Sequence, residues 1–146
     1  MGIHTALDTN GALGQRLTDA ELDTIDLVLL DIKSWDEGHH RQLTGIEVGP
    51  VLEFARRLAA RKRPMWLRFV LVPSPTDDPN DIAQIASFTA SLGNVERVDV
   101  LPFHQMGRFK WSELKLNYML SDVQPPAAEA LAMVLSRFRA EGLKAY

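Results

Sequence analysis

The alternation of short apolar runs with helical segments is the feature that most constrains the fold. Four runs are rich in β-branched and other apolar residues, at 3–9, 25–33, 65–72 and 95–103. Helical or polar segments separate them, and a strand, a helix and a second strand in succession fold as a right-handed parallel unit. We therefore expect an α/β protein with four parallel strands and flanking helices. The uninterrupted apolar stretch at 27–30 indicates a strand buried on both faces, as in parallel sheets.

Several predicted helices carry recognisable start signals. Thr18 and Glu21 have the spacing of a capping box at the start of a short helix. Pro50 suits the first turn of a helix over about 50–63, and Asp77 or Asp78 is expected to cap the helix that follows the third strand. Residues 36–44 are interpreted as a short helix or a loop that contains a solvated histidine pair.

The C-terminal third of the chain is less regular. Residues 104–123 are expected to form an irregular segment whose aromatic residues pack onto the rim of a barrel. The last helix is predicted between Pro125 and Gly142. Its expected inward residues are Ala128, Leu131, Ala132, Leu135 and Phe138.

No Pro/Gly/Ser-rich linker or low-complexity stretch divides the chain, so residues 1–146 are predicted to form a single domain. Two architectures fit the order of elements: an open doubly wound sheet, or an arc of a β/α barrel. The sequence contains neither Gly-x-Gly-x-x-Gly nor a Walker A loop, which weakens the nucleotide-binding open sheet.

Composition excludes several classes of function. The formal net charge of −3 provides no basic field for nucleic acid, and the longest apolar runs are too short to cross a bilayer. The first residues lack the pattern of a secretory leader, so we expect a cytoplasmic protein that binds neither nucleic acid nor membrane. The absence of cysteine excludes disulfides, thiolate catalysts and a cysteine-ligated iron–sulfur cluster held by this chain alone.

Polar residues follow the apolar runs where parallel strands would end. The carboxyl ends of such strands carry the site in α/β folds, and alternation puts Asp31 and Lys33 on one face of their strand and Arg68 and Val70 on one face of the next. We expect the last strand to present Val98, Val100 and His104 to the same mouth. The polar set converging there is Asp8, Thr9, Asp31, Lys33, Arg68 and His104.

Such a set suits a zwitterionic ligand, because carboxylates pair with an ammonium group and Lys or Arg pairs with a carboxylate. Each residue also has a structural interpretation: a turn at 8–11, an ion pair between Asp31 and Lys33, a buried pair for Arg68, and an ordinary loop position for His104.

Four segments together carry a resemblance to a known family: IHTALDTNG at 3–11, LVLLDIK at 27–33, LRFVLVP at 67–73 and LPFHQMGRFKW at 101–111. In this order they resemble the pyruvate formate-lyase-activating enzymes, glycyl-radical activases of the radical S-adenosylmethionine superfamily. The resemblance implies an incomplete TIM-like β/α barrel of six strands, of which this chain holds the C-terminal four as a half-barrel. It also implies a [4Fe–4S] cluster that cleaves S-adenosylmethionine, and a glycyl-radical enzyme, pyruvate formate-lyase, as the partner.

The resemblance assigns roles residue by residue. It places Asp8, Thr9, Asp31, Lys33, Val70 and His104 at S-adenosylmethionine. A monovalent cation is implied beside Asp8, Thr9 and Asp31. Arg68 and His104 are implied to contact the glycine-bearing segment of the partner.

The family's CxxxCxxC and Gly-Gly-Glu motifs are missing from the sequence. Without thiolates no cluster is held, so we expect this chain alone to bind S-adenosylmethionine weakly and to carry out no radical chemistry. One alternative is a non-catalytic module that docks on the lyase or complements a separate N-terminal half. Another is an unrelated barrel hydrolase or aldolase that uses Asp31 and Lys33. A half-barrel exposes the edge of its first strand, which predicts either self-association there or marginal stability of the chain.

Overall fold

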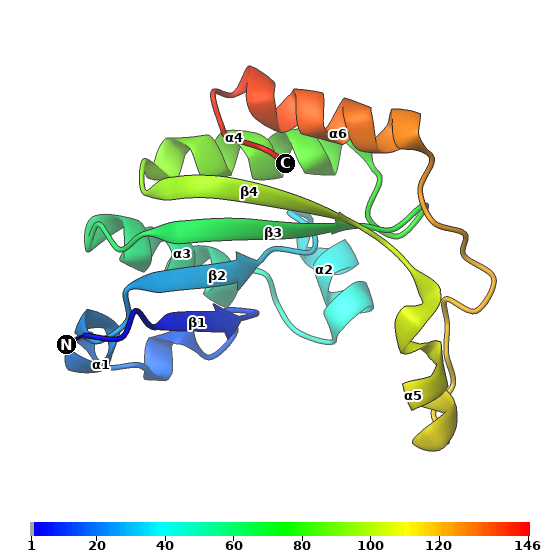
Figure 1. Cartoon of the computed structure of the whole chain (residues 1–146), viewed down its shortest axis with the longest axis horizontal. Coiled ribbons are helices and arrows are strands. Elements are labelled where there is room, and N and C mark those ends of the chain that lie inside the picture. Colours follow the sequence, from blue (N-terminus) through cyan, green and yellow to red (C-terminus); the bar gives the residue numbers. More distant parts are fainter. Residues whose placement is uncertain (1) are drawn as a thin grey trace.

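Four parallel strands form one sheet in the computed structural model, which describes residues 2–146. The strand order is sequential, and all strands point the same way (Figure 1). The strands are β1 (Ala6–Thr9), β2 (Leu27–Asp31), β3 (Met65–Leu71) and β4 (Val95–Pro102). This arrangement confirms the α/β class and the four predicted strands. β1 is shorter than expected and begins at Ala6.

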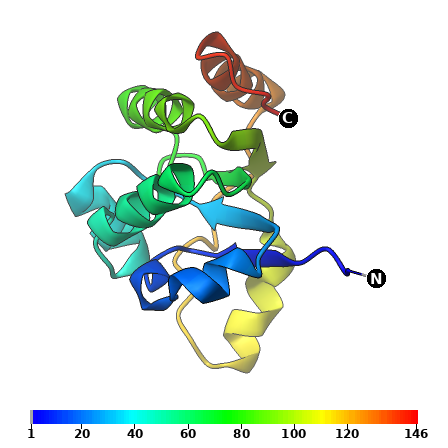
Figure 2. The ribbon, with the colours of Figure 1, turned by 90° about the vertical axis from the view of Figure 1, so that its left-hand side faces the viewer.

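The long helices lie on one side of the sheet, and within residues 2–146 no long helix covers the other side (Figure 2). They are α3 (Gly49–Ala60), α4 (Pro79–Leu92) and α6 (Ala128–Ala140). The shorter elements are η1 (Gly14–Arg16), α1 (Asp19–Asp23), α2 (Glu37–Thr44), η2 (Gln105–Gly107) and α5 (Arg108–Glu113). A sheet that curves around one open side and carries its helices outside is the arc of a β/α barrel.

Burial alternates along the strands, and this alternation defines the two faces of the sheet. In β2, Val28 and Leu30 are buried against the helices, whereas Leu29 and Asp31 on the other face are half-buried. The expectation that this strand is buried on both faces is therefore wrong. A second layer covers only one face of the sheet within residues 2–146, so the open face holds the charged side chains.

The cap signals in the sequence are confirmed. Thr18 and Glu21 form a reciprocal capping box at α1, and the carboxylate of Asp78 accepts hydrogen bonds from the backbone of Asn80 and Asp81 at the start of α4. Residues 37–44 form helix α2, which ends at Gly45 with φ of 78°, a conformation that glycine adopts without strain.

Two expectations for the C-terminal third were wrong. Residues 108–113 form α5, which projects from the carboxyl ends of the strands (Figure 1) and leaves Phe109 57% exposed; Trp111 packs on Tyr118 instead of on a barrel rim. In α6, Ala128 and Ala132 are exposed, and the most buried side chains belong to Val134 and Phe138.

The two edges of the sheet differ. The C-terminal residues pair with β4, where the N–H of Val98 donates to Lys144 and that of Val100 donates to Tyr146. Across the described residues, β1 pairs with β2 on one side and with no strand on the other. None of the helices described is long and apolar enough to cross a membrane.

Candidate functional site

The ends of β1, β2 and β3 bring four predicted residues into one chain of ion pairs. Arg68 Nη2 lies 2.5 Å from Asp8 Oδ1, and its Nε lies 3.2 Å from Asp31 Oδ1, without the alignment of a hydrogen bond. Lys33 Nζ lies 3.3 Å from Asp31 Oδ2. The parallel register places Asp31 beside Arg68, which explains why residues distant in sequence meet. We call these four residues the strand-end cluster.

Two positive and two negative groups make the strand-end cluster electrically balanced. Asp31 is the most sheltered, with 18% of its side chain exposed, whereas 59% of the Asp8 side chain is exposed. Lys33 has one ion-pair partner for three N–H donors, so it retains capacity to bind a ligand. Carboxylates and cations side by side can therefore receive both ends of a zwitterion.

The other predicted site residues lie around this cluster without joining its ion pairs. Val70 is half-buried on the same face of β3 as Arg68, as alternation predicts. Thr9 lies on the opposite face of β1 from Asp8, and its hydroxyl accepts a hydrogen bond from the N–H of Gly11. His104 is exposed, and its Nδ1 accepts a hydrogen bond from the N–H of Met106, which caps η2.

The expected orientation of the last strand is wrong. Val98 and Val100 are buried with the helices, while Arg97 and Asp99 lie on the open face. Asp99 is paired in register with Arg68, and an irregularity between Met65 and Trp66 sets this register. Charged residues alternate with valines in the sequence of this strand, and this alternation indicates that the charged residues lie on the open face.

On the β4 side of the open face, the Arg97 side chain contacts a carboxylate and two aromatic rings. Its Nε donates to Asp99 Oδ1 at 2.6 Å, and its guanidinium lies 4.7 Å from the ring centroid of Trp66 and 4.8 Å from that of Tyr146. The side chain is thus held between two aromatic rings, and one of these rings belongs to the C-terminal residues that pair with β4. This cluster stabilises the sheet edge away from the strand-end cluster.

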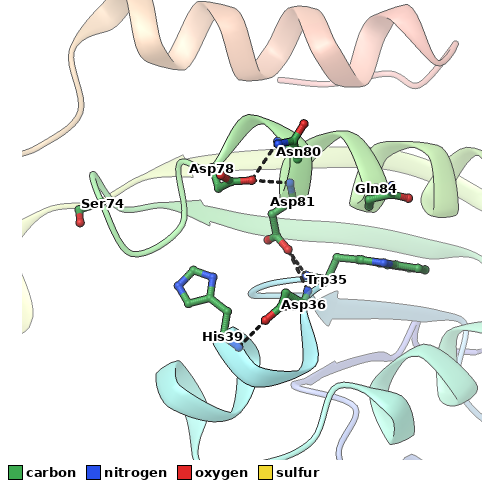
Figure 3. A pocket seen from close by; sticks show the side chains of 8 residues that line it. All are labelled: Trp35, Asp36, His39, Ser74, Asp78, Asn80, Asp81 and Gln84. Atoms are coloured by element: carbon green, nitrogen blue, oxygen red, sulfur yellow. Dashed lines mark hydrogen bonds between the residues drawn. The ribbon is translucent and has the colours of Figure 1, made fainter.

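A buried carboxylate holds the loop that follows Lys33. Asp81 Oδ1 accepts hydrogen bonds from the backbone N–H groups of Trp35 at 2.8 Å and Asp36 at 2.9 Å, and from the hydroxyl of Ser34 at 3.0 Å. Figure 3 shows Asp81 reaching from α4 to this loop. α4 therefore fixes the backbone just beyond the strand-end cluster. The sequence predicted no role for Asp81.

The adjacent histidines have different environments, although both were expected to be solvated. His39 is half-buried beside a cavity of about 560 Å³ between α2 and α4. His40 is 2% exposed, and its Nδ1 lies 3.0 Å from the carbonyl oxygen of Ile46. The expectation for His40 is therefore wrong, because α2 turns this ring toward the protein interior.

A second charged group lies at the other end of the strands, where α1 meets the end of α3. Arg61 and Arg63 donate hydrogen bonds to Asp23, which lower the pKa of its carboxyl below the ordinary value of 3.8. A hydrogen bond from Arg57 likewise lowers the pKa of Asp19. These pairs join successive β/α units and face away from the strand-end cluster.

The residues present do not fit an iron–sulfur cluster. The chain contains no cysteine, and across residues 2–146 no three His, Asp or Glu side chains are grouped so as to hold a metal ion. Iron–sulfur clusters in proteins are held by thiolates, with histidine as an occasional replacement.

Solved structures define the class of protein. A domain of a pyruvate-formate lyase-activating enzyme from Bacteroides vulgatus is 26% identical and superposes with a TM-score of 0.77, over 99% of this chain and 80% of that one. A radical SAM methyltransferase from Sphaerobacter thermophilus, at 15% identity and a TM-score of 0.62, shares the fold over 97% of this chain and 39% of its own. The fold is thus the partial α/β barrel of radical S-adenosylmethionine enzymes.

Curated sequences show a more specific similarity. Pyruvate formate-lyase-activating enzymes from Listeria monocytogenes and Staphylococcus epidermidis are 38% and 41% identical over 90% and 89% of this chain. The pyruvate formate-lyase 1-activating enzyme of Escherichia coli is 38% identical over 91% of it. The matches cover 56%, 54% and 55% of these relatives, so the chain spans about half their length. No model of a known family matches the chain. By sequence, the chain is a homologue of the pyruvate formate-lyase-activating enzymes.

Proposed function

We propose that the chain forms the C-terminal four strands of the S-adenosylmethionine site of a glycyl-radical activase that acts on pyruvate formate-lyase. The observation that supports this most is the balanced strand-end cluster. S-adenosylmethionine carries an ammonium and a carboxylate on its methionyl end and hydroxyls on its ribose. The paired Asp31 and Lys33 offer acceptors and donors for such groups at the carboxyl ends of parallel strands.

Individual residues take different parts in this proposal. Asp31, the most sheltered member of the strand-end cluster, and Lys33, which retains N–H donors, bind the ligand directly. Val70 supplies apolar contact beside Arg68, and Arg68 turns from Asp8 to the glycine-bearing segment of the partner. Asp8, Thr9 and Asp31 border the monovalent cation, and His104, exposed at the end of β4, contacts both ligand and partner segment.

Radical chemistry requires an electron donor, and this chain has no cysteine to hold the cluster that would serve as one. In the family a cysteine-ligated cluster would supply the electron for radical chemistry on S-adenosylmethionine, whereas the residues of this chain would hold and orient that ligand. With no cysteine, the chain contributes binding and orientation, and a second polypeptide segment must carry the cluster.

Calorimetric titration of the purified chain with S-adenosylmethionine tests the binding step. We expect measurable weak binding that Asp31→Asn reduces by about tenfold, because one charge-assisted contact is lost. Asp122→Asn, a change on the exposed segment after α5, serves as the matched control and should bind like the unmodified chain. Absence of binding, or equal binding by Asp31→Asn, would contradict the proposal. Formation of 5′-deoxyadenosine by the chain with dithionite alone would contradict its inactivity.

Association through the β1 edge is the second part of the proposal. Ala6–Thr9 pairs with β2 on one side, and a free strand edge beside an open sheet face favours addition of another strand. We propose that β1 receives a second copy of the chain or a separate N-terminal half. Sedimentation over a range of concentrations should show reversible association that Ala6→Pro weakens, because the parallel register with Leu27 turns the Ala6 N–H to the free edge. A concentration-independent monomer that also fails to bind a cysteine-bearing N-terminal half would refute this part.

A further inference from the structure

A cavity of about 410 Å³ lies at the carboxyl ends of β1 and β2, between the loop after β1 and α2. Its lining combines polar and apolar groups, among them Asn10, Leu13, Asp31, Lys33, His40 and Ile46. Two members of the strand-end cluster therefore share this cavity with a buried histidine. Its volume is within the range of small-molecule sites, which is about 300–1,000 Å³.

The hydrogen bonds of His40 fix its tautomer. Its Nδ1 lies 3.0 Å from the carbonyl oxygen of Ile46, and a carbonyl can only accept, so Nδ1 carries the proton. Thr44 supports this arrangement, since its hydroxyl lies 3.2 Å from the same nitrogen and donates to the carbonyl of His40. In the neutral ring, Nε2 is consequently a lone-pair acceptor, and it is the nitrogen that His40 can offer to a ligand in the cavity.

The neighbouring groups define the chemistry of that ligand. Lys33 retains N–H donors beyond its contact with Asp31, while Asp31 and the neutral His40 ring accept. A hydroxyl group both donates and accepts, so a pair of adjacent hydroxyls satisfies donor and acceptors together. Ala12, Leu13 and Ile46 supply apolar surface for a flat ring beside them.

We propose that this cavity is a nucleoside subsite in which His40 Nε2 accepts a hydrogen bond from a ribose hydroxyl. The proposal rests on the proposed function, because S-adenosylmethionine contains such a ribose. It adds a binding residue on α2, at a position where the sequence indicated a solvent-facing side chain. The hydrogen bond to Ile46 alone would make His40 structural, and the experiment separates the two roles.

Nitrogen NMR of the histidine rings in the full chain provides the direct measurement, at a mildly alkaline pH where imidazole is neutral. The free protein should show His40 protonated on Nδ1. Addition of adenosine or S-adenosylmethionine should move the Nε2 resonance upfield, as expected for an acceptor that gains a hydrogen bond. The matched ligand 2′,3′-dideoxyadenosine, which lacks both hydroxyls, should leave that resonance in place.

The variant His40→Asn gives an independent readout, because its amide retains a donor for the Ile46 carbonyl and lacks Nε2. We expect about a tenfold loss of adenosine affinity, as for one neutral hydrogen bond. The control His39→Asn makes the same change at the neighbouring histidine, which borders the cavity between α2 and α4 instead, and should bind adenosine like the unmodified chain. An Nε2 resonance unmoved by saturating adenosine, or unchanged affinity in His40→Asn, would overturn the subsite.

The outcomes also separate the subsite from the proposed function. S-adenosylmethionine binding without any Nε2 change overturns the subsite and leaves the proposed function standing. An Nε2 change with adenosine but no binding of S-adenosylmethionine supports the subsite and refutes the proposed function. Failure of both ligands to bind overturns both.

Discussion

The hydroxyl of Thr76 closes the turn after β3, and its removal should cost more stability than the small change in volume suggests. Its Oγ1 accepts a hydrogen bond from the N–H of Val72 at 2.7 Å and donates to the carbonyl of Val70 at 2.7 Å. The side chain is 4% exposed, so water cannot replace the lost partner. Thr76→Val has nearly the same shape but leaves a buried N–H without an acceptor.

The expected magnitude follows from these contacts. An unsatisfied buried donor costs about 1–3 kcal/mol, and the lost bond to the Val70 carbonyl adds about 1 kcal/mol. We therefore expect Thr76→Val to lower the free energy of unfolding by about 2–4 kcal/mol. Thr76→Ser retains the hydroxyl and loses one methyl group, which costs about 1 kcal/mol.

Urea unfolding followed by circular dichroism measures both variants. With a slope of about 2 kcal/mol/M, the midpoint of Thr76→Val should fall by about 1–2 M and that of Thr76→Ser by about 0.5 M. If Thr76→Val were as stable as Thr76→Ser, the hydrogen bonds would contribute nothing and the reasoning would fail.

Two further predictions concern the ion pairs and the C-terminal residues. The pKa of Asp23 is lower in the folded chain than its ordinary value of 3.8, so its stabilising contribution is present above that value and is lost as the pH falls through the lowered folded pKa. Asp23→Asn should therefore flatten the dependence of stability on pH below about 4 relative to the control Asp77→Asn, and an unchanged slope in urea titrations would contradict this. Arg97→Ala removes two ring contacts of about 0.5–1 kcal/mol each, so hydrogen exchange at the Tyr146 amide should accelerate about five- to thirtyfold. Exchange as slow as in the control Glu96→Ala would show that the rings do not hold these residues.

Local signals in the sequence predicted the elements well. The capping box at Thr18 and the proline at the start of α3 depend on backbone geometry within a few residues, so the sequence contains the necessary information. The convergence of Asp8, Asp31 and Arg68 was also predictable, because the carboxyl ends of parallel strands share one edge of a sheet.

Features that depend on distant partners were not predictable from the same patterns. The face of β4 is an exception, because it was assigned wrongly although Arg97 and Asp99, which alternate with buried valines, indicated the open face. The roles of Asp81 and His40 depend on a loop and a carbonyl that their own helices do not contain. The orientation of α6 follows from its contacts with α4 and β4.

The pairing of the last three residues with β4 has a practical consequence for the handling of this protein. An affinity tag fused directly after Tyr146 would start inside a hydrogen-bonded ladder and beside the ring that covers Arg97. A peptide added there has to turn away from the sheet immediately, or it disturbs the hydrogen bonds between Tyr146 and β4. A purification handle is better placed ahead of Gly2, which is exposed; a Cβ atom added to Gly2 would meet no other part of the protein within 4 Å.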